Sequence, residues 1–449
     1  MIKPGEIIVI GGNAAGPSAA AKAKRTNPDA HVTMFETGEY ISTGTCEIPY
    51  VLSGEIKSYK DLLYFDSKSF REKKDVDVYI KHKVEEINRK EKEIKVLDLY
   101  NGTTHFYKYD KLIIATGAKP KSLKQFSIPA KNLFTLKDIA NLVKVQEYLF
   151  VNEVRSISVI GSGYIGLETA DVLSSKGFIV TVIEKENHPL PFAEPEIQLL
   201  IEDILTKNNI RFFGGVKNLK PNYTDDKVES LNVDGRIIEV DMIIISVGFL
   251  PDSDLAKNAK LEIGEYGGIR VDATLKTSDP HIYAAGDCIE IMNEITKRPF
   301  YLPLATISHD YAHIAGENAA GRNKRVNPVV KNISVKLWDK FFISVGLSSS
   351  EAKENKFKFK AESDTAYNRV TVMPGSEKVF GKIIYEAESK RILGASFIGG
   401  EEVSGYGDLI SALIKAKQSA KILADINYNY TPPLSPHLNL LSLLGRKIS

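Results

Sequence analysis

The sequence of 449 residues predicts an α/β fold made of two strand-and-helix units and a smaller α+β unit at the C-terminal end. Two observations support this prediction. An apolar strand, a glycine-rich turn, a helix and a second strand follow one another at residues 7–36 and again at residues 156–184. Alternation of this kind forms a parallel sheet with both faces covered. After about residue 328 the pattern changes to short alternating runs, at 334–338 and 341–346, which are typical of antiparallel strands.

The composition is that of a globular protein, with 43% hydrophobic and 26% charged residues. A net charge of +2 provides no electrostatic footprint for a nucleic acid or an anionic membrane. No apolar run approaches the roughly 18 residues that span a bilayer, and the first residues lack the features of a secretory signal. The two cysteines, Cys46 and Cys288, form no disulfide framework. We therefore expect a cytoplasmic protein that acts on a small molecule, with neither a nucleic acid nor a membrane as partner.

Each glycine-rich turn has the full context of a dinucleotide-binding motif, because it follows an apolar strand and opens a helix. Glu36 and Glu184 close the strands that come next. A pyrophosphate needs close backbone approach and the N–H groups of a helix N-terminus, while the carboxylate accepts hydrogen bonds from a ribose hydroxyl. The units are therefore predicted to be Rossmann-like. The first turn consists of Gly11, Gly12, Asn13, Ala14, Ala15 and Gly16, and the second of Gly161, Ser162, Gly163, Tyr164, Ile165 and Gly166.

Asn13 stands where a second glycine is usual, so a pyrophosphate bound to the first turn has to tolerate a side chain there. Gly177 fits the left-handed residue that ends the helix of the second unit. Near the C-terminal end, residues 407–423 show helical periodicity.

Two dinucleotide sites in one chain imply electron transfer between two cofactors, and a flavin with a nicotinamide nucleotide is the obvious pair. Glu184 favours NADH over NADPH, because a carboxylate at that position repels a 2′-phosphate. Lys185 follows directly and could soften this preference.

The order of motifs along the chain resembles the pyridine nucleotide–disulfide oxidoreductase family, which has the glutathione reductase-like fold. The resemblance rests on residues 11–16, 115–117, 161–166, Gly248 and 285–287, and it covers essentially the whole chain. It implies a discontinuous FAD-binding domain at 1–118 and 247–328, an NAD(P)H-binding domain at 119–246, and a dimerisation domain at 329–449. A homodimer is therefore expected.

The resemblance also implies roles for single residues. Asp287, next to Gly286, would bind the ribityl chain of FAD, and Val84 would reach the adenine end through its backbone. Tyr164 would be a gate that moves aside for the nicotinamide, with Glu168 close to that junction. The other residues implied at FAD are Ala115, Thr116, Gly117, Leu304 and Ala305, of which the last two would lie under the isoalloxazine ring.

Cys46 is the candidate redox residue. Two-cysteine members of the family carry a second cysteine five positions on, where this chain has Val51, so the chemistry has to use one thiol. The run at 46–50, Cys-Glu-Ile-Pro-Tyr, resembles the single-cysteine branch of coenzyme A-disulfide reductases, NADH oxidases and peroxidases, and persulfide or polysulfide reductases. A short helix from Cys46 to Leu52, stopped by Gly54, would place the thiol at a helix N-terminus, where its pKa is lowered.

Five other residues, near the Cys46 motif or elsewhere in the chain, bear on the choice of reaction. Glu47 departs from the branch, which usually has a small residue there. Ala14 stands where the oxidase and peroxidase members have a histidine, which weakens the oxidase interpretation. Cys288 is expected to be a packing residue. His309 and His313 share a helix face without a further ligand at suitable spacing, so we expect a structural role rather than a metal site.

Tyr430 begins a Tyr-Thr-Pro-Pro run that resembles the tyrosine–Pro–Pro motif of coenzyme A-disulfide reductases. In that branch the tyrosine reaches the active cysteine of the partner subunit, so Tyr430 would steady a departing thiolate, or else only pack in the interface. Leu434 and Met373 stand where the branch often has an aromatic residue and a second tyrosine. Substrate contacts are expected at Ser42 and Thr45, and the coenzyme A phosphates would need basic residues. Lys22, Lys24 and Arg25 are candidates for this role, although they could equally form a solvated helix face.

The sequence thus predicts an FAD-dependent NAD(P)H oxidoreductase that reduces a low-molecular-weight disulfide, persulfide or polysulfide through Cys46. Coenzyme A disulfide is the best single candidate. One alternative is an NADH oxidase or peroxidase, with oxygen or peroxide as acceptor. Another is a flavoprotein that reduces a protein electron carrier, which the presence of Cys46 in its motif disfavours.

Overall fold

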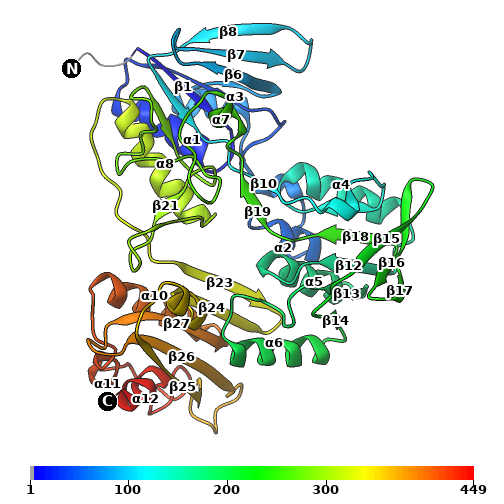
Figure 1. Ribbon diagram of the computed structural model, residues 1–449, viewed down its shortest axis with the longest axis vertical. Helices are drawn as coiled ribbons and strands as arrows, with labels where there is room; N and C mark the ends of the chain where they lie inside the picture. The colour runs from blue at the N-terminus through cyan, green and yellow to red at the C-terminus, as the bar shows by residue number, and fades with distance from the viewer. Residues whose placement is uncertain (1–4, 449) are drawn as a thin grey trace.

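The computed structural model describes residues 5–448 and contains a five-stranded sheet in each of three units (Figure 1). The first sheet is parallel, with the order β20-β9-β1-β2-β5. Its strands are β1 (Glu6–Ile10), β2 (His31–Phe35), β5 (Asp77–Tyr79), β9 (Lys111–Ile114) and β20 (Ile282–Ala284). The helices α1 (Ala15–Thr26) and α8 (Ala305–Ala319) pack against each other beside this sheet.

Smaller elements complete the first unit. An antiparallel sheet of β6 (His82–Asn88), β7 (Glu93–Asp98) and β8 (Thr104–Lys108) lies at the top in Figure 1. The segment after β2 forms β3 (Ile41–Thr43), α2 (Ile48–Ser53), a 3₁₀ turn (Tyr59–Leu62), β4 (Leu63–Phe65) and α3 (Ser67–Lys74). Later in the chain lie α7 (Asp254–Asn258), β21 (Ile291–Met292) and β22 (Pro299–Phe300).

The second sheet is also parallel, with the order β11-β18-β12-β13-β14. Its strands are β11 (Leu133–Thr135), β12 (Ser156–Ile160), β13 (Ile179–Ile183), β14 (Arg211–Phe213) and β18 (Met242–Ile245). The helices of this unit are α4 (Ile139–Val151), α5 (Tyr164–Ser175) and α6 (Pro195–Lys207), and Gly177 follows α5 with the predicted left-handed φ of +88°. A three-stranded sheet comprises β15 (Leu219–Thr224), β16 (Lys227–Val233) and β17 (Arg236–Glu239). A 3₁₀ turn spans Lys124–Phe126.

The chain passes between the first two units twice, through β10 (Ala118–Pro120) and β19 (Phe249–Pro251), which pair antiparallel to each other. The two parallel sheets therefore take strands from residues 6–114 with 282–284, and from residues 133–245. The predicted boundaries at residues 118 and 246 fall between these sheets. The boundaries themselves stay a prediction.

The third sheet is antiparallel, as predicted, with the order β23-β24-β27-β26-β25. Its strands are β23 (Asn332–Leu337), β24 (Lys340–Gly346), β25 (Phe359–Tyr367), β26 (Lys378–Glu386) and β27 (Ile392–Gly399). The helices of this unit are α9 (Ser349–Glu354), α10 (Glu402–Lys415), α11 (Ile422–Asp425) and α12 (Leu440–Lys447). The helical pattern at 407–423 is thus divided between two helices, because Lys417 has a left-handed φ of +54°. Within residues 5–448, no helix combines the length and apolar character that a membrane crossing requires.

A buried carboxylate joins the second unit to the third. Glu194, at the start of α6, is 1% exposed and accepts hydrogen bonds from the backbone N–H and the hydroxyl of Ser349, at 2.6 and 2.8 Å. The Lys382 ammonium group lies 2.8 Å from the same carboxylate and 2.9 Å from Glu196. A second contact comes from the β23–β24 hairpin, where the Trp338 backbone N–H donates to Asp171 on α5 at 2.7 Å.

We expect Lys382→Ala to destabilise the protein by roughly 2 kcal/mol, because it leaves the buried Glu194 carboxylate without its cation while Ser349 still donates to it. Chemical unfolding followed by the fluorescence of Trp338, the single tryptophan, measures this change. Lys358→Ala is the matched control, since Lys358 and its partner Glu388 have side chains that are 86% and 85% exposed. The control should leave the unfolding midpoint unchanged. An equal loss of stability in both variants would contradict the stabilising role of the Lys382–Glu194 ion pair.

Candidate active site

A cavity of about 1720 Å³ is bordered by both glycine-rich turns, by the segment that carries Cys46, and by the start of α8. Because the first turn follows β1 and the second follows β12, the carboxyl ends of both parallel sheets contribute to this one cavity. Most of the predicted site residues line it: Gly11, Gly12, Asn13, Ala14, Ala15, Glu36, Thr45, Cys46, Ala115, Thr116, Gly117, Gly161, Gly163, Tyr164, Ile165, Glu168, Glu184, Gly248, Asp287, Leu304 and Ala305.

Three predicted glycines shape the backbone instead of lining the cavity. A Cβ atom at Gly16 would collide with the carbonyl oxygen of Gly11, and one at Gly166 with that of Gly161. At Gly286 an added Cβ would lie 2.7 Å from the Cβ of Ala15. Gly16 and Gly166 require glycine because the backbone packs against itself there, and Gly286 because the Ala15 side chain occupies the space and its φ is +87°.

Two further predicted residues, Val84 and Ser42, also lie outside the cavity lining. Val84 is buried in β6, where it pairs with Val96. Ser42 has a left-handed φ of +51°, and its backbone N–H donates to Gly12 at 2.8 Å. The roles expected for these two residues stay predictions.

The cavity fits two dinucleotides by its own chemistry. The hydroxyl groups of Thr169, Ser246 and Tyr301 are buried without a hydrogen-bond partner, and all three residues line the cavity. A ligand with phosphate, hydroxyl and ring-nitrogen acceptors would supply the missing partners. In addition, Gly117 and Gly163 border the cavity, and a Cβ at either position would meet nothing within 4 Å. These open positions leave room for a ligand to approach the backbone.

The two acidic residues that end β2 and β13 also hold their own turns. Glu36 accepts from the backbone N–H groups of Gly12 and Gly38, both at 2.6 Å, and burial raises its pKa. Glu184 accepts from the backbone N–H and hydroxyl of Ser162 at 2.8 and 2.9 Å, and from the Glu186 N–H at 3.1 Å. Each carboxylate is therefore fixed at the rim of its turn, where a ribose is expected.

The side chain of Asn13 has a role that residue spacing does not reveal. Its carbonyl oxygen accepts hydrogen bonds from the backbone N–H and the hydroxyl of Thr43, at 3.3 and 2.9 Å. Thr43 ends β3, the strand that leads to Cys46. The non-glycine residue thus connects the first turn to the cysteine segment.

Cys46 lies in a turn between β3 and α2, and the helix ends at Gly54, which has the expected left-handed φ of +84°. The predicted stop is therefore confirmed, while the helix begins at Ile48, after the cysteine. Cys46 is exposed to the cavity. The expected lowering of its pKa is wrong: enclosure of the sulfur by protein raises the pKa, and the charges of Glu47, Glu168 and Asp287 raise it further. The thiol also lies before the helix and not at its first residue, since α2 begins at Ile48.

Glu47 is held at the edge of the cavity. Its carboxylate accepts a hydrogen bond from the Tyr64 hydroxyl at 3.2 Å and folds back towards Gly44. Cys288, by contrast, is fully buried, and its thiol donates to the carbonyl oxygens of Ile114 and Ala285 at 3.5 and 3.3 Å. Burial raises the Cys288 pKa to about 11. The packing role predicted for Cys288 is confirmed.

Two features that motif spacing could not supply border the expected cofactor sites. The Ser308 hydroxyl, one turn into α8, donates to Asp287 at 2.6 Å and fixes that carboxylate. The ring of Tyr164 packs on Phe192, with 4.4 Å between the ring centres, so the expected gate residue has an aromatic support. The rings of His309 and His313 meet edge to face with 4.2 Å between their centres, and the described part of the chain holds no group of three or more potential metal ligands.

The basic residues of α1 are partly occupied. Lys22 pairs with Glu317 at 2.7 Å and Lys24 with Asp75 at 2.9 Å, whereas Arg25 is exposed. Tyr430 lies outside the cavity lining, is 54% exposed, and packs against His437 at 5.7 Å between ring centres. The expected contacts of Lys22, Arg25 and Tyr430 with substrate stay predictions.

Comparisons with known proteins agree with this arrangement. Residues 5–305 match the pyridine nucleotide-disulphide oxidoreductase family, and residues 341–441 match its dimerisation domain. The chain is 31% identical to the NADH oxidase of Methanocaldococcus jannaschii over 97% of both chains. It is 27% identical to the coenzyme A disulfide reductase of Staphylococcus aureus, over 98% of this chain and 99% of that one.

A solved structure extends this similarity to the fold. The NAD-dependent persulfide reductase from A. fulgidus superposes with a TM-score of 0.94 and 30% identity, over 98% of this chain and 82% of that chain. The motifs, the cavity and the family match lead to one conclusion. The chain belongs to the pyridine nucleotide-disulphide oxidoreductase family, with FAD and NAD(P)H as its cofactors.

Proposed function

We propose that this flavin-dependent NAD(P)H oxidoreductase reduces the sulfur–sulfur bond of a low-molecular-weight disulfide, persulfide or polysulfide through Cys46. The single observation that carries the proposal is the placement of the two cysteines. Cys46 is exposed in the cavity that both glycine turns border, whereas Cys288 is buried in the core of the first unit. An internal dithiol is therefore absent, and a sulfur substrate has to meet one thiol. Coenzyme A disulfide is the best candidate, since a relative in the same family carries that name.

Different residues of the cavity have different roles in this reaction. The glycine turns and their carboxylates bind the dinucleotides, and the Tyr164–Phe192 pair forms a wall beside the second turn. FAD held by the first turn would supply the two-electron redox chemistry that side chains lack. The Cys46 thiolate attacks one substrate sulfur, a new S–S bond forms, and the other sulfur leaves as a thiolate that takes up a proton.

Cys46→Ser tests the proposal. We expect NADH oxidation supported by coenzyme A disulfide or polysulfide to fall at least roughly 1000-fold, because the hydroxyl group cannot carry the exchange. Flavin content and the flavin spectrum should be unchanged. Cys288→Ser is the matched control and should retain the turnover.

The same experiment decides between this proposal and an NADH oxidase, the name of the relative that is 31% identical. Oxygen-dependent turnover that needs no thiol substrate and persists in Cys46→Ser would contradict our proposal and support the oxidase.

The acidic surroundings of Cys46 predict a second result. Glu47→Gln removes a charge that raises the Cys46 pKa, so the thiol should ionise at lower pH. At pH 7.5 we expect iodoacetamide to alkylate Cys46 roughly two- to fivefold faster in this variant. Glu55→Gln, outside the large cavity, is the control and should match the parent protein. Equal rates in all three proteins would show that the Glu47 charge does not reach the sulfur.

NADH is the favoured electron donor, because the Glu184 carboxylate is fixed at the second turn and Lys185 pairs with Glu186 at 3.3 Å. We expect kcat/KM for NADH to exceed that for NADPH, and Glu184→Gln to reduce this preference roughly tenfold by removing the repulsion of a 2′-phosphate. Steady-state kinetics with both nucleotides measures the ratio. Glu202→Gln, on α6, is the control. A parent enzyme that prefers NADPH would contradict this assignment.

A further inference from the structure

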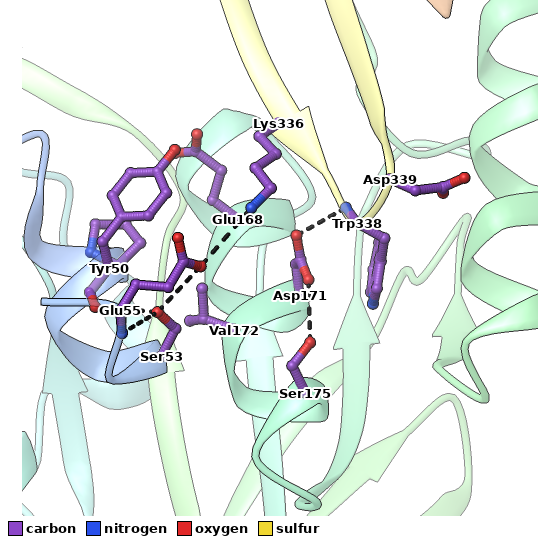
Figure 2. Close-up of a pocket in the computed structure, with 11 residues that line it drawn as sticks. Tyr50, Ser53, Glu55, Glu168, Asp171, Val172, Ser175, Lys336, Trp338 and Asp339 are labelled. Carbon is purple, nitrogen blue, oxygen red and sulfur yellow. Dashed lines mark hydrogen bonds and ion pairs between the residues drawn. The ribbon is translucent and has the colours of Figure 1, made fainter. Parts of the chain in front are cut away.

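A smaller cavity, of about 270 Å³, is shown in Figure 2. It adjoins the large cavity. It lies between α2, α5 and the β23–β24 hairpin. Three residues, Pro49, Tyr50 and Glu168, border both cavities. Glu168 therefore lies where the two cavities meet, and it is half-buried. On the side of the large cavity, the charge of Glu168 raises the pKa of the Cys46 thiol.

The small cavity leads from Glu168 to the protein surface. Its lining includes the exposed residues Glu55, Ser175 and Asp339, whereas Asp171 is only 8% exposed. In Figure 2 the side chains of Tyr50 and Glu168 point towards each other at one wall. The lining thus passes from charged surface residues to a carboxyl group beside the active cavity.

Each element around Glu168 contributes a defined group. From the hairpin, a backbone hydrogen bond from Lys336 holds the Glu168 carboxylate, just as Trp338 holds Asp171. The Lys336 ammonium group is 3.7 Å from Glu55 and 5.8 Å from the centre of the Tyr50 ring.

The remaining charges that face Glu168 are acidic or can become so. They are Asp171 on the same helix, Tyr50 on α2 and Cys46 on the cysteine segment, while Glu55 and Asp339 line the small cavity with Glu168.

These surroundings set the protonation of Glu168. Burial raises its pKa to about 7, the charge of Asp171 adds to the rise, and the hydrogen bond from Lys336 opposes it. Near neutral pH both forms of the group are therefore populated: the neutral acid, which can donate a proton, predominates at lower pH and the carboxylate at higher pH. A carboxyl group with this pKa gains and loses a proton readily at neutral pH.

The proposed reaction needs such a group, because NAD(P)H, one proton and R–S–S–R yield NAD(P)⁺ and two R–SH. The proton has to come from solvent. No histidine is among the residues that line the large cavity of the described chain. Glu168 is the carboxyl group that borders both the large cavity and the small one.

We propose that Glu168 exchanges the reaction's proton between the active cavity and solvent in the small cavity, an inference that rests on the proposed function. When a product thiolate is released, the O–H bond of Glu168 breaks and the S–H bond of the product forms. The resulting carboxylate then regains a proton from solvent through the small cavity. No electrons move in this step.

The test compares the pH dependence of kcat in the FAD-loaded enzyme, with NADH and coenzyme A disulfide. The parent enzyme should lose activity above about pH 7, as Glu168 ionises. Glu168→Gln should be at least roughly tenfold slower at pH 6.5 and should lack this decline, because an amide cannot donate an acid proton. Glu168→Asp should restore the decline. Asp171→Asn, at a neighbour that borders only the small cavity, should keep the decline but move it to lower pH, because the charge of Asp171 contributes to the raised Glu168 pKa.

A pH decline that persists in Glu168→Gln would overturn the proposal. A Glu168→Asp variant whose kcat does not decline at high pH would also overturn the proposal. That result would mean that the carboxyl group positions other groups and does not donate a proton.

A second readout does not need turnover. In the reduced, FAD-loaded protein, the pH profile of Cys46 alkylation by iodoacetamide should shift to lower pH in Glu168→Gln, by roughly half a unit or more. An unshifted profile would show that Glu168 carries no charge near the thiol and would overturn the proposal. If the parent enzyme turns over no disulfide or polysulfide at any pH, the proposed function fails. A parent enzyme that is active but loses nothing in Glu168→Gln refutes the proton role alone.

Discussion

The active cavity depends on a backbone contact that is made twice. In each Rossmann-like unit, the last glycine of the turn packs directly on the carbonyl oxygen of the first, at Gly16 on Gly11 and at Gly166 on Gly161. This contact brings the start of α1 or α5 close to the end of its strand, and it leaves helix N–H groups facing the cavity. Because both turns border one cavity, the two cofactors are brought together. The Asn13–Thr43 hydrogen bonds then attach the cysteine segment to the first turn.

The negative charges of the cavity disfavour ionisation of the Cys46 thiol. Cys46 faces three carboxylates, so its thiolate is disfavoured until something lowers the local negative charge. When Glu168 is protonated, it no longer adds a negative charge near Cys46. The same proton is then available for transfer to the departing thiolate. The C-terminal unit takes part as well, since its hairpin donates backbone hydrogen bonds to Glu168 and Asp171. Docking of that unit therefore contributes to the acid–base behaviour of the site.

Local patterns predicted much of this structure. The two glycine turns, the helix stops at Gly54 and Gly177, and the antiparallel C-terminal sheet follow from residue spacing and from backbone preferences that glycine alone satisfies easily. The pKa of Cys46 could not be predicted in this way, because Glu168 and Asp287 are remote in sequence and meet the thiol only in the fold. The partners of Asn13 and Glu194, likewise, are set by tertiary packing.

The central claim is that Cys46 exchanges electrons with a sulfur substrate, and an anaerobic titration with NADH tests it most directly. The account predicts that enzyme carrying a mixed disulfide at Cys46 consumes two equivalents of NADH before the flavin is fully reduced. Coenzyme A disulfide should then reoxidise the enzyme. If one equivalent bleaches the flavin and oxygen is the sole acceptor that restores it, the account is contradicted.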